Sequence, residues 1–149
     1  MICSQREVRM KVSEAMNRDV ATISPDANLI EAATIMRARN IGFLPVIEDR
    51  KVLGVLTDRD IVIRSIYEDQ SPLSTKVSEV MTSTSIWCYE EDVLTDAAKI
   101  LADHHIRRLL VFDRDKSLVG LLSLDDLAAK MSSDRLLGSV LRQVTAVVA

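Results

Sequence analysis

The sequence predicts a mixed α/β (α+β) fold built from two copies of one strand-helix-strand-strand-helix unit, and three observations predict it. First, VSEAM at Val12 to Met16 recurs as VSEVM at Val77 to Met81, so the chain contains a tandem repeat with an offset of 65 residues. Second, the same helical pattern of apolar residues occurs in both copies. Third, two short apolar segments separated by a charged turn follow that pattern each time.

The helical pattern places apolar residues at i, i+3, i+4 and i+7, which is the stripe of a helix that packs on a sheet. The stripe consists of Leu29, Ala32, Ala33 and Met36 in the first copy and of Leu94, Ala97, Ala98 and Leu101 in the second. Asn28 and Glu31 predict a capping box at the start of the first helix. Val93 takes the place of Asn28 in the second copy, so that helix needs a different cap.

The apolar segments predict one β-hairpin in each copy. The first strands cover Ile41 to Ile47 and Ile106 to Phe112, and the second strands contain VLGVL and LVGLL. At Gly54 and Gly120 the offset has become 66, so the second copy carries one extra residue, which we place at Ser117 in the turn.

A helical pattern follows each hairpin. A polar segment comes after the first of these helices, and an apolar tail comes after the second. The helices are expected at Asp58 to Tyr67 and Leu124 to Met131, and the polar segment Glu68 to Thr75 is typical of a linker. The tail has apolar residues at helical spacing: Leu137, Val140, Leu141, Val144 and Val148. A C-terminal helix is therefore expected, docked either on the core of its own chain or on a partner subunit.

Composition excludes several classes of protein. The chain has 149 residues, 48% of them hydrophobic, which is enough for a compact core. A net charge of −3 and 3% aromatic residues argue against nucleic acid as a partner. We expect no membrane segment or signal peptide and a cytoplasmic location, because no apolar run reaches about 18 residues. Cys3 and Cys88 form no CxxC pair, and His104 and His105 have no ligand partners at metal-site spacing.

These motifs together resemble a tandem pair of cystathionine-β-synthase (CBS) domains, known as a Bateman module. The resemblance rests on both VSE-x-M segments, both helix stripes, IGFLPVI and GVLTDRDI. It implies two β-α-β-β-α motifs packed sheet to sheet about a pseudo-two-fold axis, adenine nucleotides in the clefts between them, and a homodimer. The expected boundaries are 11–67 for the first motif, 68–75 for the linker, 76–131 for the second motif and 132–149 for the helical tail.

GVLTDRD and GLLSLDD carry the candidate ligand residues. Gly54 and Gly120 allow either a ligand or another strand to approach the backbone closely. Thr57 and Ser123 either cap the next helix or bind a ligand through their hydroxyl groups. Asp60 and Asp126 lie in the first helical turn, where an ionised carboxylate is favoured and can accept two hydrogen bonds from a ribose diol. The resemblance implies that these carboxylates hold ribose and the hydroxyl groups hold sugar or phosphate; the alternative is a helix cap alone.

Further candidates lie at the starts of the strands. The resemblance implies that the base is contacted by Thr22, Ile23, Ile41, Gly42, Phe43, Pro45, Trp87 and Cys88. Trp87 takes the place of Thr22 and either stacks on adenine or is a half-buried sheet residue. Arg107 and Arg108 are phosphate candidates, as is Arg59. If the adjacent pair lies on a strand, only one of the two side chains faces the cleft.

The sequence contains no GxGxxG, P-loop, HExxH or GxSxG motif, so we expect a protein that is not an enzyme. The main expectation is a regulatory module that requires no cofactor, senses AMP, ADP or ATP, and signals through dimer geometry or an unidentified effector protein. The alternative is a scaffold of the same fold that dimerises or binds a partner without any ligand.

Overall fold

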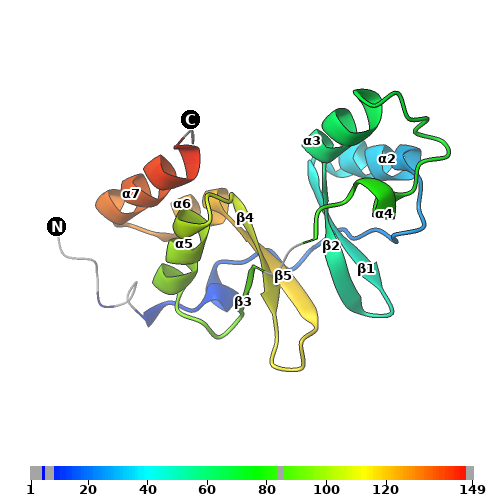
Figure 1. Cartoon of the computed structure of the whole chain (residues 1–149). Coiled ribbons are helices and arrows are strands. Elements are labelled where there is room, and N and C mark those ends of the chain that lie inside the picture. Colours follow the sequence, from blue (N-terminus) through cyan, green and yellow to red (C-terminus); the bar gives the residue numbers. More distant parts are fainter. Residues whose placement is uncertain (1–4, 6–8, 84–85, 147–149) are drawn as a thin grey trace. The chain divides into compact units, whose positions relative to one another are not determined.

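The computed structural model describes residues 5, 9–83 and 86–146. The chain divides into two compact units (Figure 1). Unit 1 combines Met1–Asp19 with Ile86–Ala149, and unit 2 is Val20–Ser85. Within the described residues, no helix is long and apolar enough to cross a membrane.

Unit 2 is a β-hairpin with helices. Its elements are α2 (Leu29–Arg39), β1 (Phe43–Glu48), β2 (Lys51–Thr57), α3 (Asp58–Ile61), the π-helical turn η2 (Val62–Ile66) and α4 (Val77–Val80). Strands β1 and β2 pair antiparallel, which confirms the first predicted hairpin. The expected strand before α2 is reduced to one residue, Ile23, which forms a parallel bridge with Val46.

Unit 1 contains a sheet of three strands with the order β3-β4-β5. Its elements are the 3-10 turn η1 (Val12–Glu14), β3 (Trp87–Tyr89), α5 (Leu94–Asp103), β4 (Arg108–Phe112), β5 (Leu118–Ser123), α6 (Leu124–Lys130) and α7 (Asp134–Thr145). Strand β4 pairs parallel with β3 and antiparallel with β5. Phe112 is opposite Leu118, whereas Ile47 in unit 2 is opposite Val52, so the extra residue of the second copy lies in the turn as expected.

The predicted helix stripes supply much of each core. The buried members are Leu29, Ala32 and Met36 of α2 and Leu94, Ala97, Ala98 and Leu101 of α5, whereas Ala33 is exposed. The capping box of α2 is formed: Asn28 Oδ1 accepts from the Glu31 N–H at 2.9 Å, and Glu31 Oε2 accepts from the Asn28 N–H at 2.8 Å. The first turn of α5 is satisfied differently, because the Leu94 N–H donates to the Met10 carbonyl at 2.7 Å.

The two VSE segments are exchanged between the copies. Val12 and Ser13 donate their N–H groups to the carbonyls of Asp92 and Glu90, both at 2.9 Å. At the repeat positions in unit 2, Val77 and Ser78 donate to Ala27 and Pro25 at 2.8 and 3.0 Å. The segment that begins the first sequence copy therefore folds with the body of the second, and the reverse holds in unit 2. The compact units thus cut across the repeat boundaries in the sequence.

The residue after each VSE segment pairs with a hairpin strand beside a glycine. Thr82 and Val55 exchange backbone hydrogen bonds at 2.9 Å, as do Asn17 and Leu121. A Cβ on Gly54 would collide with the Thr82 carbonyl oxygen, and one on Gly120 would lie 2.7 Å from the Met16 sulfur. Of the two roles open for these glycines, the structure shows the close approach of another strand.

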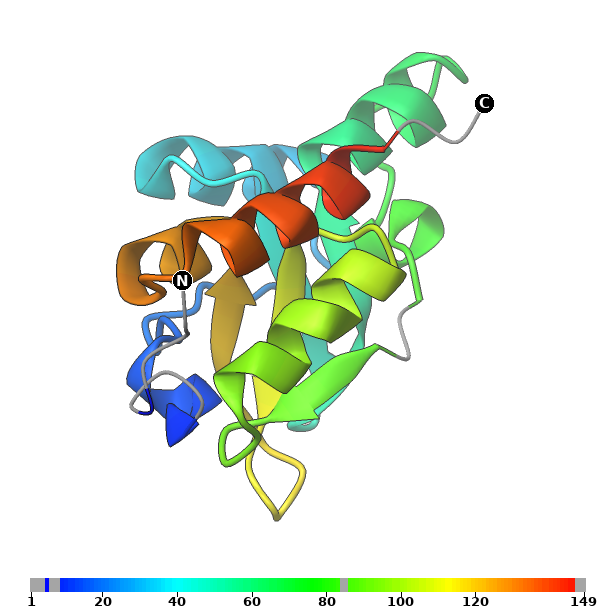
Figure 2. The ribbon, with the colours of Figure 1, turned by 90° about the vertical axis from the view of Figure 1, so that its left-hand side faces the viewer.

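Helix α7 docks on the core of unit 1 beside α5 (Figure 2). Val140 and Val144 are buried in that core, while Leu136 and Leu137 pack at its edge. The tail stripe therefore lies on a helix as far as Val144, and Val148 falls outside the described residues. Of the two docking surfaces that the sequence left open, α7 uses the core of its own chain.

Gly54→Ala is expected to destabilise the protein by about 1–3 kcal/mol, because the new methyl group would push the Thr82 strand away from β2. Gly138→Ala in α7 is the matched control: its nearest contact would be the Arg142 guanidinium at 3.7 Å, so the helix should gain about 0.5–1 kcal/mol. Urea unfolding of the three proteins measures both values. Equal stability of Gly54→Ala and the wild type would contradict the strand-contact explanation.

Candidate functional site

The Thr/Ser-x-x-Asp motifs form capping boxes where β2 and β5 lead into α3 and α6. Thr57 Oγ1 accepts from the Asp60 N–H, and Asp60 Oδ2 accepts from the Thr57 N–H, both at 3.0 Å. Ser123 Oγ accepts from the Asp126 N–H at 3.2 Å, and Asp126 Oδ2 accepts from the Ser123 N–H at 2.8 Å. The capping role is thus present in both copies, and any ligand role must use the remaining oxygen atoms.

The second oxygen of each carboxylate has a different environment. Asp60 Oδ1 accepts from the Thr82 hydroxyl at 3.2 Å and lies 4.0 Å from Arg64 Nε. Asn17 and Lys130 stand at the corresponding repeat positions in unit 1. Asp126 Oδ1 has no hydrogen-bond partner within residues 9–83 and 86–146. Asp126 Oδ1 therefore remains available to accept a hydrogen bond from a ligand, whereas Asp60 Oδ1 already interacts with Thr82 and Arg64.

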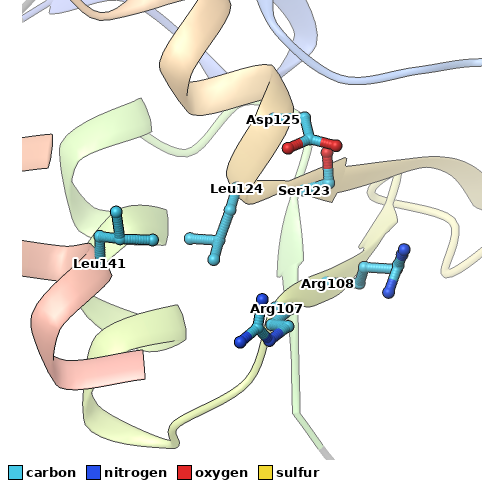
Figure 3. Close-up of a pocket in the computed structure, with 6 residues that line it drawn as sticks. All are labelled: Arg107, Arg108, Ser123, Leu124, Asp125 and Leu141. Atoms are coloured by element: carbon cyan, nitrogen blue, oxygen red, sulfur yellow. The ribbon is translucent and has the colours of Figure 1, made fainter. Parts of the chain in front are cut away.

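Unit 1 contains a pocket of about 150 Å³ (Figure 3). Its lining combines three predicted ligand residues with three others: Arg107, Arg108, Ser123, Leu124, Asp125 and Leu141. Figure 3 shows Leu124 and Leu141 pointing toward one another from α6 and α7, with Arg107 at the start of β4. The lining thus combines two arginines and one carboxylate residue, Asp125, with the apolar side chains of Leu124 and Leu141.

Both arginines line this pocket, although their guanidinium groups point to different sides (Figure 3). Strand β4 begins at Arg108, so Arg107 lies before the strand, where side chains need not alternate. The Leu124 N–H donates to the Arg107 carbonyl at 3.1 Å, and Arg108 is opposite Ser123 in the β4–β5 ladder. The backbone therefore holds the start of β4 against the start of α6. Ser123 in turn donates its hydroxyl to Asp126 Oδ2 at 2.9 Å, so Asp126 adjoins the pocket.

Unit 2 repeats this backbone arrangement with different side chains. The Asp58 N–H donates to the Gly42 carbonyl at 3.1 Å, and Phe43 is opposite Thr57. A Cβ on Gly42 would meet the Asp58 carboxylate, so that carboxylate lies over the glycine. Gly42, Phe43 and Asp58 therefore occupy the repeat positions of Arg107, Arg108 and Leu124. Unit 1 thus has two arginines at positions where unit 2 has Gly42 and Phe43, and it has Leu124 where unit 2 has the Asp58 carboxylate.

Trp87 belongs to an aromatic cluster on the sheet of unit 1. Its ring meets Tyr89 edge-on, with centroids 4.8 Å apart, and meets Phe112 at 5.6 Å. The side chain is 40% exposed. Two edge contacts restrict the ring, yet Trp87 is an exposed sheet residue with surface area left open for stacking.

The Cys88 side chain lies on the opposite face of the sheet from that of Trp87, because successive strand residues point to opposite faces. The Cys88 side chain is buried in the helix-side core. Burial, and next the negative charge of Asp92, raises the pKa of the thiol to about 12. Cys88 is therefore a neutral core residue near neutral pH.

The remaining predicted residues lie in unit 2. Ile23 and Pro45 are buried and adjacent, since the Ile23 N–H donates to the Pro45 carbonyl at 3.0 Å. Thr22 is exposed, and Ile41 is partly buried against the core of this unit.

Sequence reasoning missed Leu124, Asp125 and Leu141 as pocket residues. Leu124 and Asp125 drew attention only as departures from the first copy, and Leu141 only as a member of the tail stripe. Helical spacing of apolar residues predicts that they share one face of a helix, but it does not show which of them stays exposed. Leu141 is 47% exposed.

Comparison with known proteins agrees with this architecture. The sequence model of the CBS domain matches residues 12–66 and 77–133. The chain is 38% identical over 134 residues to the "CBS domain-containing protein YhcV" of Bacillus subtilis (strain 168), covering 90% of this chain and 94% of the relative. The chain belongs to the CBS domain family and contains two such domains.

Two solved structures show the same fold. The conserved CBS domain protein TA0289 of Thermoplasma acidophilum, of unknown function, has a TM-score of 0.77 and 25% identity, covering 90% of this chain and 75% of that one. The CBS domain pair of protein MJ0100, in complex with 5-methylthioadenosine and S-adenosyl-L-methionine, has a TM-score of 0.71 and 22% identity, covering 80% and 94%.

Asp60→Ala is expected to destabilise the protein by about 1–3 kcal/mol, because it removes hydrogen bonds of a carboxylate that also anchors Thr82. Asp126→Ala should cost less, since Asp126 bonds only to Ser123 within the described residues. Urea unfolding of both variants provides the comparison. A larger loss for Asp126→Ala would contradict the difference in environment described above.

Proposed function

We propose that this CBS domain pair is a regulatory module that binds an adenosyl nucleotide of the AMP, ADP or ATP type, with its phosphate in the pocket of unit 1. The observation that carries this proposal is that Arg107, Arg108 and Ser123 all line one pocket. Guanidinium groups bind phosphate oxygens with paired, charge-assisted hydrogen bonds. The Ser123 hydroxyl lines the same pocket, but its one donor is directed to Asp126 Oδ2. The module is proposed to act without catalysis, by changing its interactions when the ligand binds.

The size of the pocket supports a phosphate rather than a whole nucleotide at this position. Its volume of about 150 Å³ is below the range of roughly 300–1,000 Å³ that is usual for sites of complete small ligands. The ribose and base of the nucleotide would extend beyond the pocket. Asp126, which adjoins Ser123 and keeps one oxygen available, is the proposed ribose acceptor. Trp87 is the proposed stacking surface for adenine.

Unit 2 offers a weaker phosphate position. Asp58 lies over Gly42, and unit 2 has no arginine at the repeat positions of Arg107 and Arg108, so an incoming phosphate would meet a carboxylate of like charge there. In unit 1 the Asp125 carboxylate also lines the pocket, but two arginines accompany it. The Asp60 carboxylate is also engaged with Thr82. The ligand roles proposed for Thr22, Ile41, Thr57 and Asp60 therefore suit an adenosyl group without phosphate better than a nucleotide. The MJ0100 domain pair, which shares the fold, holds two adenosyl ligands that lack phosphate.

Arg107→Ala is expected to weaken AMP binding by about 10- to 100-fold, because it removes a charged hydrogen-bond donor. Adenosine binding should change by less than about twofold, since adenosine has no phosphate. Isothermal titration calorimetry at constant ionic strength measures both affinities.

Arg59→Ala is the control for that experiment. Arg59 was the other phosphate candidate in the sequence, and it stands in unit 2 at the repeat position of Asp125. Its replacement should leave AMP affinity unchanged. If Arg59→Ala lost AMP binding while Arg107→Ala retained it, the phosphate position would belong to unit 2.

A second function, association with another copy of the chain, is favoured by an exposed apolar surface in unit 2. We call it the η2 surface; it comprises Val62, Ile63, Ile66 and Tyr67, which are 51%, 48%, 63% and 85% exposed. At the repeat positions unit 1 has only small residues: Ala128, Ala129, Ser132 and Ser133. Four large apolar side chains on one short segment are typical of an interaction surface.

The charges that flank the η2 surface favour a second copy as its occupant. Arg59 precedes the surface, and Glu68 and Asp69 follow it. If two copies of this segment pack antiparallel about a two-fold axis, Arg59 of one copy lies near Glu68 of the other. The proposed homodimer would thus be self-complementary in charge.

Ile66→Asp is expected to shift the protein from dimer to monomer, because it places a charge within the apolar contact. Leu73→Asp, at a 70% exposed position in the linker, is the matched control and should stay dimeric. Sedimentation equilibrium measures the dissociation constants. A wild type that is monomeric at all concentrations would contradict the proposed homodimer.

A further inference from the structure

Helix α7 forms one wall of the proposed phosphate pocket, although it lies outside the CBS motif. The second family match ends at residue 133, and α7 spans Asp134–Thr145 with Ser133 as its cap. Leu141 of α7 nevertheless lines the pocket with Arg107 and Ser123 (Figure 3). The pocket is therefore composite: the motif supplies the polar groups, and the additional helix supplies apolar surface.

Leu141 is not one of the residues that attach α7 to the core of unit 1. The helix is held by Val140 and Val144, which are 3% and 7% exposed, and by a hydrogen bond of 2.6 Å between His105 Nδ1 and the Gln143 carbonyl. Leu141, at 47% exposure, instead points toward Leu124 across the pocket. A half-exposed leucine in the lining of this pocket costs hydration free energy, and a ligand that covers it would recover that cost.

Apolar walls also strengthen the binding of a charged group beside them. Leu124 and Leu141 reduce the water that can reach the arginines once a phosphate is in place. The attraction between guanidinium and phosphate rises as the local dielectric constant falls. By this argument the position of α7 would affect the affinity for a phosphate-bearing ligand, even though Leu141 offers no hydrogen bond.

We infer that α7 is a ligand-dependent wall of this site: a phosphate-bearing ligand binds tightly only when α7 is docked, and the bound ligand in turn stabilises the docked helix. This inference rests on the proposed nucleotide function and adds the segment by which binding is transmitted. A ligand that prefers the docked state raises its population by its difference in affinity for the two states. A partner that contacts α7 would thus distinguish the bound from the free protein.

The test combines two measurements on the full chain with AMP as the probe. Hydrogen–deuterium exchange should slow in the backbone amides of α7 when AMP is added. Leu141→Ala should weaken AMP binding by about three- to tenfold in calorimetry, because three carbon atoms of apolar wall are lost. Leu141→Met, which keeps an apolar side chain of similar volume, should restore the affinity.

Leu73→Ala is the matched control, since it shortens an exposed leucine far along the chain from the pocket residues and should leave AMP affinity unchanged. If AMP binds to the wild type but α7 exchange is unaltered and Leu141→Ala binds AMP normally, the inference about α7 is wrong and the nucleotide function stands. If neither AMP, ADP nor ATP binds to the wild type, the proposed function fails and the inference fails with it.

Discussion

The rest of the structure depends on the backbone pairing that joins each VSE segment to the body of the other sequence copy. Val12 and Val77 anchor these segments by equivalent hydrogen bonds, and pairing at Asn17 and Thr82 continues the contact beside Gly120 and Gly54. Neither compact unit is complete without a segment from the other copy. The two glycines therefore have a structural role, because they allow the paired segment to approach the backbone closely. This pairing holds β2 and β5 in place just before the helices that carry the candidate site.

The duplicated backbone also explains how one chain presents two different sites. The same hydrogen bond, from Leu124 to Arg107 or from Asp58 to Gly42, joins the strand and helix starts in each unit. Because this bond uses backbone atoms alone, the side chains at the junction are free to differ. In unit 1 they line a pocket with two arginines and Asp125, whereas in unit 2 the Asp58 carboxylate covers a glycine. The two copies thus share the same backbone hydrogen bond at this junction, while the charges of the side chains around it differ.

The sequence predicted the helices, the hairpins and the longer second turn, because these depend on local periodicity and turn residues. It did not predict the exchange of the VSE segments, since a repeat in the sequence does not specify which copy each segment folds with. It identified Arg107, Arg108 and Ser123 but missed Leu141, because the contact between α7 and the pocket is set by tertiary packing. It also grouped Cys88 with Trp87, although a strand turns neighbouring side chains to opposite faces.

The most direct test of the central claim, that the pocket of unit 1 holds the phosphate of an adenosyl nucleotide, is a crystal structure of the chain at saturating AMP. The account predicts phosphate oxygens within hydrogen-bond distance of both the Arg107 and Arg108 guanidinium groups, with a ribose hydroxyl on Asp126 and Leu141 against the bound group. An AMP phosphate placed instead beside Asp58 and Gly42, or an empty pocket in unit 1 at saturation, would contradict it.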